Sequence, residues 1–438
     1  MRLSRRTSAQ VSHGLVALFG ILVLCQGCAA LRATIAAYDV GPNGIATHQQ
    51  RLREALAHQD FERALEWAED DRLLRVLNEG ASAFYASQYA RSVAVLDSAA
   101  MLADDRITKS LSAEALALVT NDMARPYVTT RTERLFIAYY AMLACAREDQ
   151  WEDAAVEARR LSAMLLQFAS DRADGERVSH AMMHYIAGAV FERADELDDA
   201  RVAYRVARAL APELVDSARA YPEAGEGELL VVVERGFVAH RATEAVNVFV
   251  GGEQSDRRSG RGPRRHEHEG DVDGDEGYWV SVAFPVFRPS RRSWSGVSLL
   301  ADDHSLDGSR ISSVVDDATI ADGQRERTAL LARAATRAAA KYVLTKAVKD
   351  RKGEVAGQIV NYGTALLERA DIRSWHVLPQ EITVLRAHLT EGQHHLAVST
   401  GSAALVDAGL VTVKAGRLTV TSVRLWRDTP STELAVRR

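Results

Sequence analysis

Two histidines and three aspartates lie close together in the chain and could bind a divalent metal ion. They are His266, His268, Asp271, Asp273 and Asp275. Alternating aspartates are typical of the EF-hand calcium loop, which requires Gly at its sixth position and Glu at its twelfth. A loop that begins at Asp271 has Glu276 and Val282 at those positions. Because the tract at 252–277 is charged and Gly-rich and lacks apolar periodicity, we expect a disordered insertion there and no metal site.

The sequence lacks the motifs of several common enzyme classes. No serine is flanked by glycines at the spacing of a hydrolase nucleophile elbow, and no Gly-Lys pair is present for a phosphate-binding P-loop. No His-Glu-x-x-His motif and no cysteine pair at zinc-binding spacing occurs in the mature chain. Carboxylates are plentiful, but no two of them stand out as a glycosidase pair. We therefore expect no enzyme and no cofactor, with a glycan-cleaving enzyme as the alternative.

Length and composition are those of a globular protein. The chain has 438 residues, of which 47% are hydrophobic and 26% are charged. At roughly 150 residues per domain, this length allows two or three domains. There are 54 basic and 59 acidic residues, giving a net charge of -5. Nucleic-acid-binding proteins usually carry a basic excess, so this balance argues against DNA or RNA as a partner.

The first 28 residues have the layout of an export signal. Arginines at positions 2, 5 and 6 precede an apolar stretch at 14–24, which is shorter than the roughly 20 residues of a transmembrane helix. Gly27 and Cys28 resemble a bacterial lipobox, in which the cysteine is acylated and becomes the mature N-terminus. Ala29 then indicates the outer membrane, by the sorting rule of Gram-negative lipoproteins. The alternative is an ordinary signal peptide with an incidental cysteine.

The remaining chain divides into two halves with different patterns. We expect a signal peptide at 1–27, a lipidated N-terminus and linker at 28–45, a helical domain at 46–222 and a mixed α/β domain at 223–438. The helical half has apolar residues at three- and four-residue spacing and few Gly or Pro residues. The predicted fold class is α+β, with an α-helical tetratricopeptide-like solenoid followed by a mixed α/β domain of mainly antiparallel strands.

The helical half shows degenerate repeats. One copy matches the tetratricopeptide pattern at six positions: Gly188, Phe191, Ala200, Tyr204, Ala207 and Pro212. In that pattern small residues lie where paired helices touch and Pro ends the second helix. Equivalent turn positions at residues 61, 89, 151 and 197 are separated by 28, 62 and 46 residues, so we expect insertions between the repeats.

Stacked helical hairpins form a concave face that commonly binds a partner. By register, the inward positions of this face are Phe84, Tyr85, Tyr139, Arg147, Tyr185 and Arg193. Aromatic rings interleaved with arginines could hold a peptide or a glycan, which makes this face the candidate groove for an envelope protein partner. The alternative is that the tyrosines pack between helices and the arginines are solvated.

The second half alternates strand patterns with helices. The predicted strands are 229–233, 245–250, 278–287, 382–389, 395–399, 410–413 and 418–425. Helices are expected at 324–349 and around 356–369. Arg333, Arg337 and Lys341 are spaced every four residues on the first of these helices. This stripe could contact anionic lipid or a cell-wall polymer, or it is an ordinary solvated face.

A short motif after the helices carries a family resemblance. Asp371, Arg373, Ser374, Trp375, Leu378 and Pro379, followed by a predicted hairpin at 389–398, resemble the hallmark of an uncharacterised family of bacterial envelope lipoproteins. The resemblance implies a helical-repeat front half, a lipid anchor and no assigned activity. From the residues themselves, we expect Asp371 and Arg373 to clamp a loop over Trp375 as a structural corner, with a catalytic site as the alternative.

Together these observations predict an outer-membrane-anchored periplasmic lipoprotein. Its helical repeats would bind a protein partner, as in a scaffold or adaptor. A regulator of cell-wall synthesis or turnover is the alternative within the class of binding proteins.

Overall fold

The computed structural model describes most of the chain between residues 47 and 427. The described residues are 47–68, 70–117, 126–212, 222–250, 278–290, 296–306, 308–352, 370–400 and 405–427. Three sequence predictions lie outside them: the export segment with Cys28, the charged insertion at 252–277 and the helix around 356–369.

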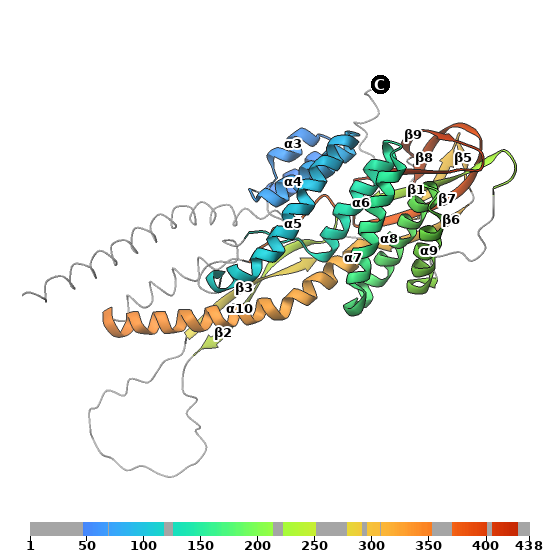
Figure 1. Ribbon diagram of the computed structural model, residues 1–438. Coiled ribbons are helices and arrows are strands. Elements are labelled where there is room, and N and C mark those ends of the chain that lie inside the picture. Colours follow the sequence, from blue (N-terminus) through green and yellow to red (C-terminus); the bar gives the residue numbers. More distant parts are fainter. Residues whose placement is uncertain are drawn as a thin grey trace, which may run out of the picture.

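The first half of the described chain is helical and forms successive hairpins (Figure 1). Its helices are α2 (Thr47–Ala57), α3 (Phe61–Glu66), α4 (Arg72–Tyr85), α5 (Tyr89–Ala117), α6 (Arg131–Arg147), α7 (Trp151–Gln167), the short 3-10 helix η2 (Ala169–Asp171), α8 (Asp174–Arg193) and α9 (Leu197–Leu210). Each even-numbered helix from α2 to α8 packs against the odd-numbered helix that follows it. The helical half predicted from the sequence is therefore present.

The four hairpin turns have the same length and the same backbone conformation. Each contains three residues, and the middle residue has a positive φ: Gln59 (57°), Ser87 (59°), Asp149 (58°) and Asp195 (62°). The turn positions predicted at 61, 89, 151 and 197 are the first residues of α3, α5, α7 and α9. Because the turns are equal, the unequal spacing comes from the lengths of the helices, such as 29 residues in α5 against 6 in α3, and of the segments that join the hairpins.

Two glycines allow the paired helices to approach closely. A Cβ atom on Gly188 of α8 would lie 2.9 Å from Cε1 of Tyr204 in α9. On Gly80 of α4 it would lie 2.7 Å from Cδ2 of Leu96 in α5. Real Cβ atoms do not approach other heavy atoms this closely, so a larger residue at either position would force its neighbour to shift.

The described part of the second half of the chain forms three sheets. The central sheet has the order β10-β1-β7-β6, from β10 (Leu418–Leu425), β1 (Glu226–Arg235), β7 (Glu381–Thr390) and β6 (Ser309–Val314). The outer sheet has the order β5-β4-β8-β9, from β5 (His304–Ser305), β4 (Ser298–Ala301), β8 (Gly392–Ser399) and β9 (Leu405–Val413). A separate hairpin is formed by β2 (His240–Val250) and β3 (Tyr278–Arg288). The pairing of β1 with β10 is parallel, and the other strand pairs are antiparallel.

Strand β1 lies in the middle of three layers, which explains its uninterrupted apolar sequence. Leu229, Val231 and Val233 face the outer sheet, where they pack with residues such as Leu396 of β8. Leu230 and Val232 belong to the core that the central sheet shares with the helices. A strand that is buried on both faces is apolar throughout instead of alternating. The helices, the central sheet and the outer sheet therefore stack in that order.

A long helix extends beyond this three-layer body. Helix α10 (Val315–Lys352) packs along β3, and both run away from the stacked sheets in Figure 1. Gly323 of α10 permits this contact, because a Cβ atom there would lie 2.4 Å from the ring of Phe287. Arg333, Arg337 and Lys341 all fall within α10. No described helix is long and apolar enough to cross a membrane.

Candidate functional site

The concave face of the helices is covered by the central sheet of the same chain. The Tyr139 hydroxyl donates a hydrogen bond to Oε1 of Glu234 (3.0 Å), and the Tyr85 hydroxyl donates to Oε2 of Glu234 (2.8 Å). Nη1 of Arg147 donates to Oγ1 of Thr421 in β10 (2.5 Å). The predicted partner groove is therefore not open at these positions, which is a correction: a sheet with an apolar face fills it.

The other predicted groove residues also have partners within the chain. Phe84 is buried, and its ring centroid lies 5.3 Å from that of Tyr140. Tyr185 is buried with its ring 5.2 Å from that of Tyr204. Arg193 lies over the Trp151 ring, at 4.5 Å from its centroid, and does not reach into a groove. The rings of Phe84 and Tyr185 thus pack against rings of neighbouring helices.

Glu234 is the centre of a buried polar cluster between α4, α6 and β1. Glu234 is fully buried and accepts the two tyrosine hydrogen bonds described above. The Tyr85 hydroxyl also lies 2.7 Å from that of Tyr140. Burial raises the pKa of the Glu234 carboxyl, and the positive charge of Arg424 opposes this shift. Burial also raises the pKa of all three tyrosines well above the usual value, so they remain hydroxyl donors at neutral pH.

Arg424 is enclosed by aromatic rings at the edge of this cluster. Its guanidinium carbon lies 4.2 Å from the ring centroid of Trp426, 5.4 Å from that of Tyr85 and 5.9 Å from that of Phe237. Nη2 donates to the carbonyl oxygens of Gly236 (2.6 Å) and Val377 (3.0 Å). The guanidinium is thus held by cation–π contacts and backbone acceptors.

A second cluster joins α8 and α9 to the central sheet through Arg386. Nε and Nη2 of Arg386 bind the two carboxylate oxygens of Glu228, at 2.5 and 2.7 Å. Nη2 also donates to Glu192 of α8 (3.0 Å), and Nη1 donates to the hydroxyl of Tyr204 in α9 (2.9 Å). Burial alone would lower the pKa of Arg386, but the hydrogen bond to Glu228 and the charges of nearby groups raise it above the usual value, so the group is always charged.

The corner predicted around Asp371 links the loop before β7 to the helices. Nε and Nη2 of Arg373 donate to the two carboxylate oxygens of Asp371, at 2.8 and 2.7 Å. Trp375 is fully buried, and its backbone N–H donates to Oε1 of Glu133 in α6 (2.9 Å). Pro379 is also buried. The contact between Asp371 and Arg373 is thus present, and Trp375 is buried.

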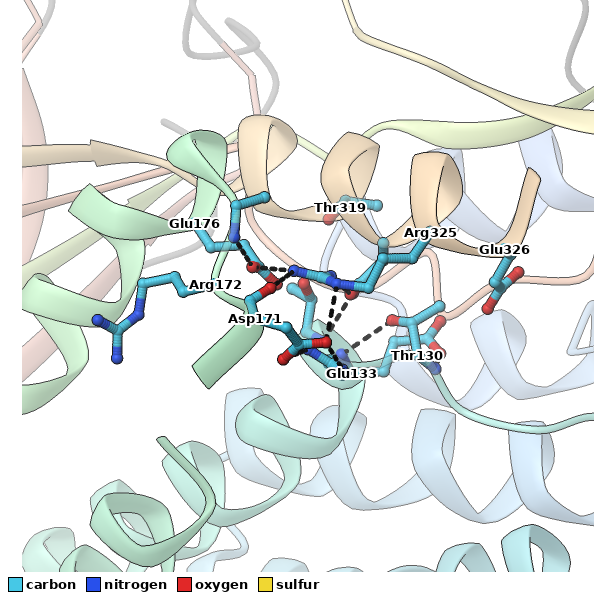
Figure 2. A network of polar contacts seen from close by, with 12 residues as sticks. Thr130, Glu133, Asp171, Arg172, Glu176, Thr319, Arg325 and Glu326 are labelled. Carbon is cyan, nitrogen blue, oxygen red and sulfur yellow. Dashed lines mark hydrogen bonds and ion pairs between the residues drawn. The ribbon is translucent and has the colours of Figure 1, made fainter. Parts of the chain in front are cut away.

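A third cluster anchors the first turns of α10 on α6 and α8 (Figure 2). The buried Asp322 accepts a hydrogen bond from the backbone N–H of Thr132 (2.8 Å), and Arg325 forms an ion pair with Glu176. Arg131 binds both carboxylate oxygens of Asp171, at 2.8 and 2.7 Å. Burial raises the pKa of Asp322 to about 6.

A serine–histidine contact in the corner is not arranged for nucleophilic catalysis. Oγ of Ser374 lies 3.2 Å from Nε2 of His376, and Nη2 of Arg53 lies 3.0 Å from Nδ1. A guanidinium can only donate, so Nδ1 is the acceptor and Nε2 carries the proton. His376 therefore donates to Ser374 and cannot remove its proton. Burial lowers the pKa of His376 well below its usual value.

The free cysteine among the described residues, Cys145, is not suited to act as a nucleophile. Cys145 is buried in α6, and burial raises its pKa to about 12, so the thiolate is not formed at neutral pH. Within the described part of the chain, no group of three or more His, Cys, Asp or Glu residues is placed to hold a metal ion.

Several residues of these clusters are not among the site residues predicted from the sequence. Arg386 and Arg424 are charged residues inside predicted strands, and Glu228 and Glu234 flank the predicted apolar strand at 229–233. Charges at these positions were the signal that could have found them. Comparison with known proteins adds no relative: no family model matches the chain, and neither a curated protein nor a solved structure is significantly similar.

Proposed function

We propose that the protein is a non-enzymatic scaffold of the bacterial envelope, anchored to the outer membrane through acylated Cys28. The observation that carries this proposal is the set of contacts that the buried carboxylates make. Glu234 and Glu228 of β1 and Asp322 of α10 are each bonded to a partner in the helical half or to an arginine that binds that half. Charged groups of this kind join the two halves of the protein and are not exposed to a substrate.

The helical half supports a scaffold because its hairpins are of one kind. Equal three-residue turns and the close contacts at Gly80 and Gly188 favour a tetratricopeptide-like assignment for these hairpins. Since the concave face is filled by the central sheet, we assign partner binding to the outer surface of the helices. An envelope protein is the partner class that a lipid-anchored scaffold would meet.

The proposal is tested by expressing the full chain beside a Cys28→Ala variant in a Gram-negative host. We expect the wild type to be acylated and to fractionate with the outer membrane, and the variant to be released in soluble form. Chemical cross-linking of the wild type, followed by mass spectrometry, then identifies what it holds.

Two results would contradict the proposal in different ways. A wild type that is soluble and unacylated would remove the anchor. Hydrolysis of purified peptidoglycan or another glycan by the purified protein, lost on substitution of a carboxylate, would replace the scaffold with an enzyme.

A further inference from the structure

The outer surface of the helices contains a small pocket where α5, α6 and α7 meet. Its volume is about 110 Å³, somewhat less than the roughly 150 Å³ of an apolar cavity that admits benzene. The apolar part of its lining is formed by Ala100, Ala103, Ile137, Ala138 and Met164. A pocket of this size and lining fits one branched aliphatic side chain.

Two arginines at this pocket have unused hydrogen-bond donors. Nη2 of Arg134 binds Asp104 at 2.8 Å, and no described residue accepts from its other nitrogens. Arg160 lies 3.6 Å from Glu157 and 3.8 Å from Asp97, which is beyond hydrogen-bond distance in both cases. The charge of Arg160 is thus partly offset by these two carboxylates, but its N–H groups have no hydrogen-bond acceptor among the described residues.

We propose that this pocket binds the C-terminal residue of a partner protein, with an aliphatic side chain on the apolar lining and the free carboxylate on Arg160 and Arg134. A guanidinium group can donate hydrogen bonds to a carboxylate and carries the opposite charge. The proposal deepens the proposed function, because it gives the scaffold a class of partner.

The acidic residues around the pocket set how strong this binding can be. Asp97 and Glu157 compete for Arg160, and Asp104 competes for Arg134. Glu157 is the nearer of the two competitors for Arg160, at 3.6 Å against 3.8 Å for Asp97. Removing the charge of Glu157 should therefore free Arg160 and strengthen the binding of a carboxylate.

The test uses the full chain with Cys28→Ala, labelled with ¹³C in its methyl groups. N-acetyl-Ala-Ala-Leu with a free carboxylate is added, and its C-terminal amide is the matched probe. We expect saturable shifts of the Ile137 and Met164 methyl signals with the acid, and affinity lower by about tenfold for the amide.

Variants then separate the contributions of charge and shape. Arg160→Gln should weaken binding of the acid by about tenfold, and Glu157→Gln should strengthen it. Ala103→Leu should abolish it by filling the pocket, and Arg201→Gln, which alters an exposed ion pair on α9, should leave it unchanged. A melting temperature for each variant shows that it is folded.

Equal binding of acid and amide, or no shift at millimolar peptide, would overturn the proposal. So would binding of decanoate in place of the peptide, because the pocket would then be a fatty-acid site. None of these outcomes bears on membrane anchoring, which the fractionation of the wild type decides separately.

Discussion

Arg386 and Glu228 form a two-pronged contact inside the central sheet, with N–O distances of 2.5 and 2.7 Å and both side chains almost completely buried. The same guanidinium binds Glu192 and Tyr204 of the helical half. The contact therefore belongs to both the sheet and the interface. Disrupting this contact should therefore lower the free energy of unfolding of the whole protein.

Replacing Arg386 with Met should destabilise the protein by about 3 to 5 kcal/mol, because it leaves the Glu228 carboxylate buried without its partner. Chemical denaturation at neutral pH measures this change. The double variant Arg386→Met/Glu228→Leu should recover part of the loss, since the buried Glu228 carboxylate is removed together with its partner. The exposed pair of Arg201 and Asp198 is the matched control, and its disruption should cost at most about 1 kcal/mol. An equal loss for both pairs would show that burial does not govern this contact.

Some strands of the fold could be predicted from the sequence, and others could not. The run Leu229–Val233 predicts a buried strand correctly, because five consecutive apolar residues leave no polar face. Strand β6, with the sequence SRISSV, was missed because it is short and mostly polar. Strands β4 and β5 were missed as well, since each has four residues or fewer.

The groove shows why a correct position does not predict a contact. The repeat register placed Tyr85 and Tyr139 on the inner face, and both are there. Both contact Glu234, which is 149 residues from Tyr85 and 95 residues from Tyr139 in the sequence. Periodicity reports which side of a helix is covered, and it carries no information about which distant segment covers it.

Stability should fall as the pH is lowered from about 6.5 to about 4. Burial lowers the pKa of His180, His184 and His240 to about 4. In the unfolded chain these side chains titrate near 6.5, so between these values the unfolded state binds more protons and is favoured. Each histidine should contribute on the order of 3 kcal/mol of lost stability at pH 4. Denaturation curves at a series of pH values measure the slope.

Asp322 should act with the opposite sign over a similar range. Its pKa is raised to about 6 in the folded protein, so the folded state binds the extra proton as the pH falls toward 4. Its contribution to stability is present below about 4 and is lost as the pH rises through 6. Asp322→Asn should therefore steepen the acid-side loss, and His184→Leu should flatten it. Parallel curves for both variants and the wild type would contradict these assignments.

Gly188→Ala should destabilise the protein, although alanine is normally preferred to glycine in a helix by about 1 kcal/mol. The added Cβ atom would lie 2.9 Å from the Tyr204 ring, so α8 and α9 must move apart. Overpacking of this kind costs about 1 to 3 kcal/mol. The sign of the change in unfolding free energy is decisive, because a stabilised variant would mean that the helices are not in close contact at Gly188.

Glu234→Gln should weaken the joint between the helices and the central sheet. The carboxylate accepts hydrogen bonds from Tyr85 and Tyr139 on its two oxygens, whereas an amide offers one oxygen and turns a donor toward the second hydroxyl. The unmatched donors should cost about 1 to 3 kcal/mol. Tyr139→Phe removes one hydroxyl and should restore part of this loss in the Glu234→Gln background, although it destabilises the wild type. Because Tyr85 also lies 4.8 Å from the ring of Trp426, tryptophan fluorescence should report the change. Additive losses in the double variant would show that Glu234 and Tyr139 do not interact.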